Sequence, residues 1–174
     1  AHSYVRGNWN KEEISPIDLA KCCHDLDSMF WFANSLPEYV SSRGGLTQFK
    51  KENAPEGALE RCIDGCSVGE SGKCPYDARL LYLNKNEEEA NKHPISTISD
   101  DHSEEGRRKA LEETNYGKCV YGAAGNNVCD WQNVDVEFKN GIRGSFQLRP
   151  SGSMPTRKIT LGFQNGVLEG DLNK

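Results

Sequence analysis

The stretch KCCHDLD at positions 21–27 contains side chains that can transfer protons. His24 is the best suited of them, because an imidazole changes its charge near neutral pH. On a helix, Asp27 lies three residues after His24 and can hold the imidazole in one tautomer. Lys21 would lie about 60° further round the same helix. These three side chains are typical of an acid–base site. The alternative is a boundary His that makes only a local hydrogen bond.

Thiols form a second group. Cys62, Cys66 and Cys74 occur in one loop-like stretch with C-x3-C and C-x7-C spacings. Zinc knuckles more often show C-x2-C, so the fit of these spacings to a zinc site is imperfect. Three thiols in a loop that has no apolar core nevertheless indicate that a bound metal ion holds the loop together. Cys22 or Cys23 could supply a fourth ligand, and we select Cys23. We expect a structural zinc ion in preference to an iron–sulfur cluster. A packed loop with free thiols is the alternative.

A helix from Ser15 to about Asn34 is predicted to position His24. Ser15 can cap it and Pro16 suits its first turn, while Pro37 ends it. An apolar stripe at helical spacing is expected to face the core, and it consists of Leu19, Cys22, Cys23, Leu26, Phe30 and Ala33. The neighbouring face consists of Ala20, His24, Asp27 and Trp31. We therefore expect His24 at the rim of the core, where a cleft could open.

The middle of the chain alternates between short elements and loops. The pattern predicts a strand at 38–49, a cysteine-containing insertion at about 50–75, a short helix at 76–83, a polar linker at 84–101 and a charged surface helix at 103–114. An irregular stretch as long as the insertion is usually functional or pinned by something.

The last third of the chain is predicted to be β structure. Asn140-Gly141 and Asn165-Gly166 are tight-hairpin signals. They separate alternating segments at 134–138 and 142–148, and at 157–163 and 167–169. Residues 1–9 alternate weakly and predict one more short strand. The fold class is therefore α+β, with an open, mostly antiparallel sheet and helices on one face, and residues 1–174 form a single domain.

Composition narrows the classes of function. The 174 residues, 36% of them hydrophobic, suit one domain with one core. A net charge of −5 without a basic stripe argues against a nucleic-acid partner. We expect no signal peptide, and no apolar run approaches the roughly 18 residues that a membrane span needs. Seven cysteines, an odd number, favour a reducing, cytoplasmic setting. The sequence also lacks GxGxxG, P-loop, nucleophile-elbow and HExxH motifs.

Several of these segments, in this order, resemble the C-terminal part of the glucose–fructose oxidoreductase/inositol dehydrogenase (Gfo/Idh/MocA) family. The segments are SPIDLAKCCHDLDSMFWF, YVSSRGGLTQFKKENAPEGALERCIDGC, KCPYDARLLYL, GKCVY, DWQNVDVEFKNG and ITLGFQNGVLEGD. The resemblance covers nearly the whole chain. It implies an NAD(P)-dependent dehydrogenase whose Rossmann half, with the cofactor fingerprint and a catalytic lysine, precedes residue 1.

For the present chain, the resemblance implies a substrate-binding and oligomerisation domain for a sugar, cyclitol or related polyol. His24 would face the substrate and take or orient the hydroxyl proton as hydride leaves. The family commonly has an Asp four residues before this His, whereas the present chain has Ala20 there. Lys21 is a candidate to replace part of that role. One face of the sheet would form a homo-oligomer contact.

The resemblance also places substrate-side residues immediately before a strand, at Asp130, Trp131 and Gln132. Trp131 could equally be an aromatic that packs on the sheet. Two other functions stay open: a cysteine-stapled binding module without catalysis, and redox-neutral sugar elimination or glycoside cleavage with tightly held NAD. We expect this chain alone to be inactive and not to bind NAD appreciably.

Overall fold

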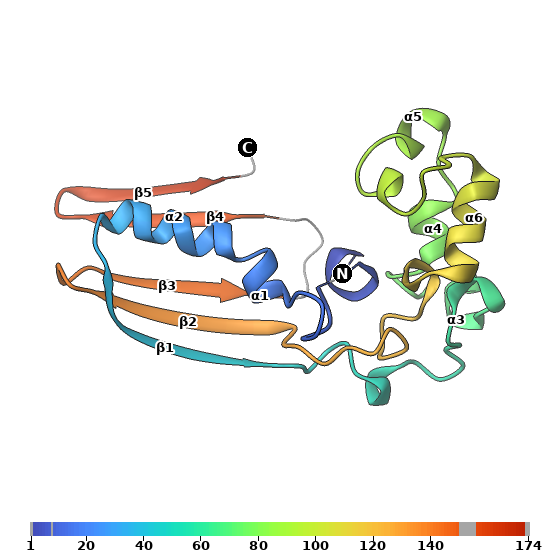
Figure 1. The fold of residues 1–174 in the computed structure, drawn as a ribbon, viewed down its shortest axis with the longest axis horizontal. Coiled ribbons are helices and arrows are strands. Elements are labelled where there is room, and N and C mark those ends of the chain that lie inside the picture. Colours follow the sequence, from blue (N-terminus) through green and yellow to red (C-terminus); the bar gives the residue numbers. More distant parts are fainter. Residues whose placement is uncertain (1, 8, 150–155, 173–174) are drawn as a thin grey trace.

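A sheet lobe and a helical lobe make up the computed structural model, which describes residues 2–7, 9–149 and 156–172 (Figure 1). The sheet lobe contains helices α1 and α2 and strands β1 to β5. The helical lobe consists of residues 46–130. A short helical turn at the N-terminus, η1 (His2–Arg6), packs against the helical lobe, because Tyr4 and Val5 belong to one of its apolar clusters.

The sheet lobe is built from antiparallel hairpins. Strands β1 (Pro37–Gly45), β2 (Trp131–Phe138) and β3 (Arg143–Leu148) pair in that order, and β4 (Lys158–Phe163) pairs with β5 (Gly166–Asp171) in a separate sheet. Gly141 adopts a φ of +83° in the β2–β3 turn, and its N–H donates to the Phe138 carbonyl at 2.8 Å. Glycine reaches this left-handed region without strain. Both predicted hairpins and the predicted α+β class are confirmed. The predicted single open sheet is wrong, because β4 and β5 pair only with each other and form a second sheet.

Helix α2 (Cys23–Ala33) covers one face of the three-stranded sheet (Figure 1). Ala33 is buried with β2 side chains, and the Phe30 ring meets the Phe138 ring edge-on at 5.7 Å. Met29 packs close to β3, since a Cβ added to Gly144 would lie 2.7 Å from the Met29 sulfur. The C-terminal half of α2 is thus held against the sheet by apolar contact.

The predicted single helix at 15–34 is interrupted. Helix α1 (Ile17–Ala20) ends before α2 begins, and the N–H of Cys22 donates to the Ile17 carbonyl at 3.1 Å, five residues back. The bend buries Cys22 while its neighbours Lys21 and Cys23 stay exposed. At the other end Asn34 adopts a left-handed φ of 46° and terminates α2, so the helix ends before Pro37 is reached.

Short elements make up the helical lobe. They are η2 (Lys51–Asn53), η3 (Cys62–Asp64), α3 (Ser67–Glu70), α4 (Ala78–Tyr82), α5 (Glu87–Ala90), η4 (Ile95–Thr97), α6 (Glu104–Glu113) and η5 (Asn115–Gly117). The expected helices at 76–83 and 103–114 correspond to α4 and α6. The Ser103 hydroxyl caps α6 by accepting the Gly106 N–H at 3.1 Å. Helices as short as these are not stable in isolation, so they depend on the packing of their side chains against neighbouring elements.

Two expectations for irregular or extended segments were wrong. The segment 84–101, predicted as a polar linker, buries Ala90, Ile95 and Ile98 in the same apolar cluster as Leu111. Residues 1–9, predicted as a strand, contain the helical turn η1 in their described part. In the ranges that the structure describes, no helix is long and apolar enough to cross a membrane.

Candidate functional site

The face of α2 that turns away from the sheet carries the predicted acid–base residues. His24 and Asp27 are exposed, and the Trp31 side chain is 75% exposed. The Ser28 hydroxyl donates to the His24 carbonyl at 2.8 Å, while no hydrogen bond joins the His24 and Asp27 side chains in the described structure. The imidazole is therefore accessible and is not held by Asp27.

Lys21 is directed elsewhere. Its ammonium group lies 5.5 Å from the centre of the Trp9 ring, a cation–π contact. The carboxylate nearest to this end of the helix, Asp25, forms an ion pair with Arg157 at 3.4 Å and so connects α2 to the β4–β5 hairpin. The structure thus places His24 and Asp27 on the first turns of α2 and Lys21 at the end of α1, before the interruption, and in the described residues no hydrogen bond joins their side chains.

Asp130 is buried, with 2% of its surface exposed, and its carboxylate is already occupied. It accepts the backbone N–H groups of Thr47 at 3.0 Å, Gln48 at 2.7 Å and Phe49 at 2.9 Å. The Thr47 hydroxyl adds a contact at 3.3 Å. A carboxylate saturated in this way anchors the start of the helical lobe, which leaves it poorly placed to hydrogen-bond a substrate.

Trp131 and Gln132 contact β1. The indole nitrogen of Trp131 lies 3.2 Å from the position that a Cβ on Gly45 would occupy, so the ring covers that glycine. The Gln132 side-chain amide donates to the Ser42 hydroxyl at 3.1 Å. Both residues therefore make cross-strand contacts, and a role toward substrate stays a prediction for them.

The loop thiols line one small cavity in the helical lobe. Cys62, Cys66 and Cys74 are joined there by Cys119 and by the Arg6 side chain. Cys23, the fourth ligand chosen from the sequence, is exposed on α2 and contacts the Ala20 carbonyl at 3.8 Å. The structure brings together the three predicted thiols and adds Cys119, not Cys23.

Sequence reasoning did not connect Arg6 or Cys119 with this cavity. A signal for Cys119 exists, because Lys-Cys-x-Tyr occurs twice, at 73–76 and at 118–121. The tyrosines of these two motifs, Tyr76 and Tyr121, meet edge-on with ring centres 6.1 Å apart. Because the same four-residue motif surrounds both thiols, Cys74 and Cys119 occupy equivalent positions at the cavity.

The thiols differ in their surroundings. Burial opposes ionisation of Cys66, yet the N–H groups of Leu59, Gly69 and Val68 that point to its sulfur lower its pKa. Burial raises the pKa of Cys119, and nearby Cys62 adds to the increase.

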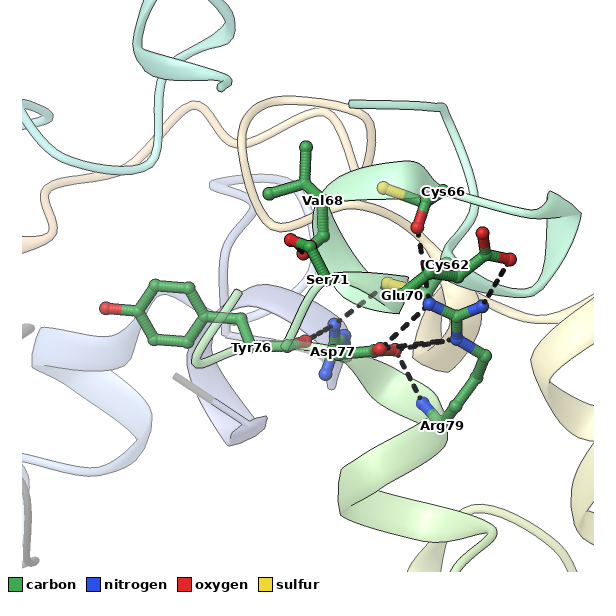
Figure 2. Close-up of polar contacts among 9 residues, drawn as sticks. Cys62, Cys66, Val68, Glu70, Ser71, Tyr76, Asp77 and Arg79 are labelled. Carbon is green, nitrogen blue, oxygen red and sulfur yellow. Dashed lines mark hydrogen bonds and ion pairs between the residues drawn. The ribbon is translucent and has the colours of Figure 1, made fainter. Parts of the chain in front are cut away.

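The Cys66 loop is held by Arg79, which donates to the Cys66 carbonyl at 3.3 Å and to the buried Asp77 carboxylate at 2.9 Å (Figure 2). This bracing fixes the backbone that carries the Cys66 thiol.

Arg6 is an unusual neighbour for these thiols, because its guanidinium is buried, with 2% of the residue exposed. It donates to the carbonyls of Tyr76 and Lys118, contacts the Cys62 sulfur at 3.6 Å and lies 5.8 Å from the centre of the Tyr82 ring. Within the described residues no carboxylate forms an ion pair with it. A buried cation without a counter-charge is energetically unfavourable.

As they stand, the described side chains include no group of three or more His, Cys, Asp or Glu residues in a metal-holding arrangement. All seven cysteines are free thiols. Comparison of the chain with protein-family models, with curated proteins and with solved structures finds no match. The resemblance to the Gfo/Idh/MocA family therefore rests on the sequence motifs alone.

Proposed function

We propose that this chain is the substrate-side domain of an NAD(P)-dependent oxidoreductase that acts on a sugar, cyclitol or related polyol. The observation that carries the proposal is the accessible His24 on the first turn of α2, with Asp27 and Trp31 exposed on the same helix. The motif resemblance assigns the substrate-facing role to this His. The proposal assigns dinucleotide binding to another part of the enzyme, and the antiparallel pairing of all described strands supports this, because dinucleotide-binding units are built on parallel strands.

In this proposal His24 would accept the substrate hydroxyl proton at a ring nitrogen, and a bound NAD or NADP would supply the hydride acceptor. Ala20 cannot supply the carboxylate that the family commonly places there, so Asp27 is the acid on this part of α2 that can stabilise a protonated His24. Trp31 offers an apolar ring surface beside the reacting carbon chain.

The test is steady-state turnover of the protein encoded by the complete reading frame with a panel of sugars and polyols. His24→Gln is expected to lower kcat/KM about a hundred- to ten-thousand-fold, the usual contribution of a general base. His102→Gln is the matched control, because His102 lies in the helical lobe and hydrogen-bonds Asn91 there at 2.6 Å. Equal activity of both variants would refute the role of His24.

A cysteine-stapled binding module without catalysis is the second candidate, and the gathering of loop thiols around one cavity favours it. The coding sequence upstream of Ala1 separates the two proposals. A strand-GxGxxG-helix unit there supports the oxidoreductase, and a start codon immediately before Ala1 contradicts it. Redox-neutral chemistry by a related enzyme differs in that NADH would not accumulate during turnover.

We further propose that the sheet face opposite α2 mediates homo-oligomer contact in a reducing, cytoplasmic setting. That face is polar and already ordered by cross-strand pairs, in which Arg143 contacts Glu137 at 3.2 Å and the Ser145 hydroxyl donates to Asp135 at 2.6 Å. Sedimentation of wild type and Asp135→Arg tests this assignment. A monomeric wild type would exclude it.

A further inference from the structure

We propose that Cys62, Cys66, Cys74 and Cys119 bind a single zinc ion, with Arg6 as the buried counter-charge. All five side chains line the same small cavity of the helical lobe. Four cysteines are the ligand set of many structural zinc sites. The inference does not depend on the proposed oxidoreductase function, because a stapled non-catalytic module would need the same site.

The backbone contacts of Arg6 around the thiols support the proposal. The Arg6 guanidinium donates to the carbonyls of Tyr76 and Lys118, which belong to the two Lys-Cys-x-Tyr segments. The rings of Tyr76 and Tyr121 lie 6.1 Å apart. Both segments are therefore held beside the same guanidinium, and this brings Cys74 and Cys119 to one cavity.

The buried positive charge of Arg6 also supports a zinc site at this cavity. Arg6 carries a positive charge that is 2% exposed and reaches the Cys62 sulfur at 3.6 Å. Four thiols that release four protons and bind one Zn²⁺ form a centre with a net charge of −2, and no electron is transferred. Arg6 then gains the anionic partner that the described carboxylates do not provide, and the centre gains partial neutralisation.

The cavity is small, with a volume of about 20 Å³, roughly the space of one water molecule. This size is compatible with a single ion. The described thiols are not in a metal-holding arrangement, so the proposal requires the four sulfurs to come closer together when the ion binds.

The site would join parts of the chain that are distant in sequence. Cys62 belongs to the apolar cluster around α4 and α6, while Tyr76, Val120 and Tyr121 belong to the cluster that contains Phe49. A zinc ion between them would fasten one cluster to the other. This role suits a lobe of short helices, because metal-binding energy adds directly to folding.

The first experiment measures metal in the chain expressed with zinc in the medium and purified without chelator. Mass spectrometry of metals is expected to give one zinc ion per chain, and thiol titration is expected to find the four cysteines unreactive until a chelator removes the zinc. Folded protein without stoichiometric zinc would overturn the proposal. Iron in place of zinc, or disulfide bonds among the four cysteines, would overturn it as well.

Variants then distinguish the ligand set. Cys119→Ser is expected to lose its zinc to a competing chelator, whereas Cys23→Ser, the matched control, retains it as the wild type does. Loss of zinc from Cys23→Ser with retention in Cys119→Ser would refute the assignment. If Cys119→Ser does not fold, the wild-type titration decides alone: thiol reactivity that does not change with zinc release contradicts the site.

Discussion

Replacing Asp130 by Ala is predicted to destabilise the protein severely. The substitution removes the acceptor for three backbone N–H groups at 2.7–3.0 Å. Phe49 is buried, so its N–H would have no water to bind, while Thr47 is exposed and can be rehydrated. One orphaned donor and two weakened contacts to a charged acceptor together correspond to about 3–5 kcal/mol of unfolding free energy.

Urea denaturation followed by circular dichroism measures this change as a lower midpoint at constant m-value. Glu112→Ala is the control, because Glu112 is exposed on α6 and should alter the unfolding free energy by only about 0.5 kcal/mol. A loss below about 1 kcal/mol for Asp130→Ala would refute the anchoring role. Intact stability with impaired substrate binding would instead support the substrate-side assignment of Asp130.

Two further predictions concern packing and thiol chemistry. Gly144→Ala should lower the unfolding free energy by at most about 1 kcal/mol, because its Cβ would lie 2.7 Å from the Met29 sulfur and this flexible side chain must shift. Gly162→Ala, which meets nothing within 4 Å, should leave the same free energy unchanged in urea denaturation, and equal losses would contradict the close approach of α2. Burial, followed by nearby Asp25, raises the pKa of Cys22 from 9.0 to about 12. The unfolded chain ionises this thiol first, so its contribution to stability is complete below pH 9 and declines as the pH rises toward 12. Alkylation mapped by mass spectrometry should therefore modify exposed Cys23 at least about tenfold faster than Cys22 at neutral pH, and comparable rates would contradict the burial.

Local signals predicted the hairpins and the capped helix well. Asn140-Gly141 succeeds because the turn needs a positive φ that glycine supplies. Ser103 predicts the start of α6 because its hydroxyl accepts an N–H that the helix leaves free. In both cases the determining contact lies within a few residues, so the sequence contains it.

Predictions failed where contacts between residues far apart in the sequence determine the local structure. The break before α2 accompanies the burial of Cys22, and helical spacing alone does not indicate it. Ala90 and Ile95 were assigned to a linker because polar neighbours dominate the segment, yet α6 supplies a partner surface for them. Asp130 could not be recognised as an anchor, because its partners lie more than eighty residues earlier.

Cys23 was preferred to Cys119 for a related reason. Proximity to the predicted catalytic helix guided the choice, whereas spatial proximity in the cavity depends on how 118–121 folds back beside 73–76. The repeated Lys-Cys-x-Tyr motif was the available signal.

The passage of the chain between the lobes has a mechanical consequence. Where the chain leaves β1, Gly45 accepts the Asp130 N–H at 2.9 Å, and the Asp130 carboxylate binds the next residues. Where the N-terminal segment crosses, Asn10 accepts the Asn127 N–H at 3.0 Å and Asn127 accepts the Glu12 N–H at 2.8 Å. Connections that are hydrogen-bonded to one another in this way oppose a hinge motion between the lobes, because bending would have to break these bonds.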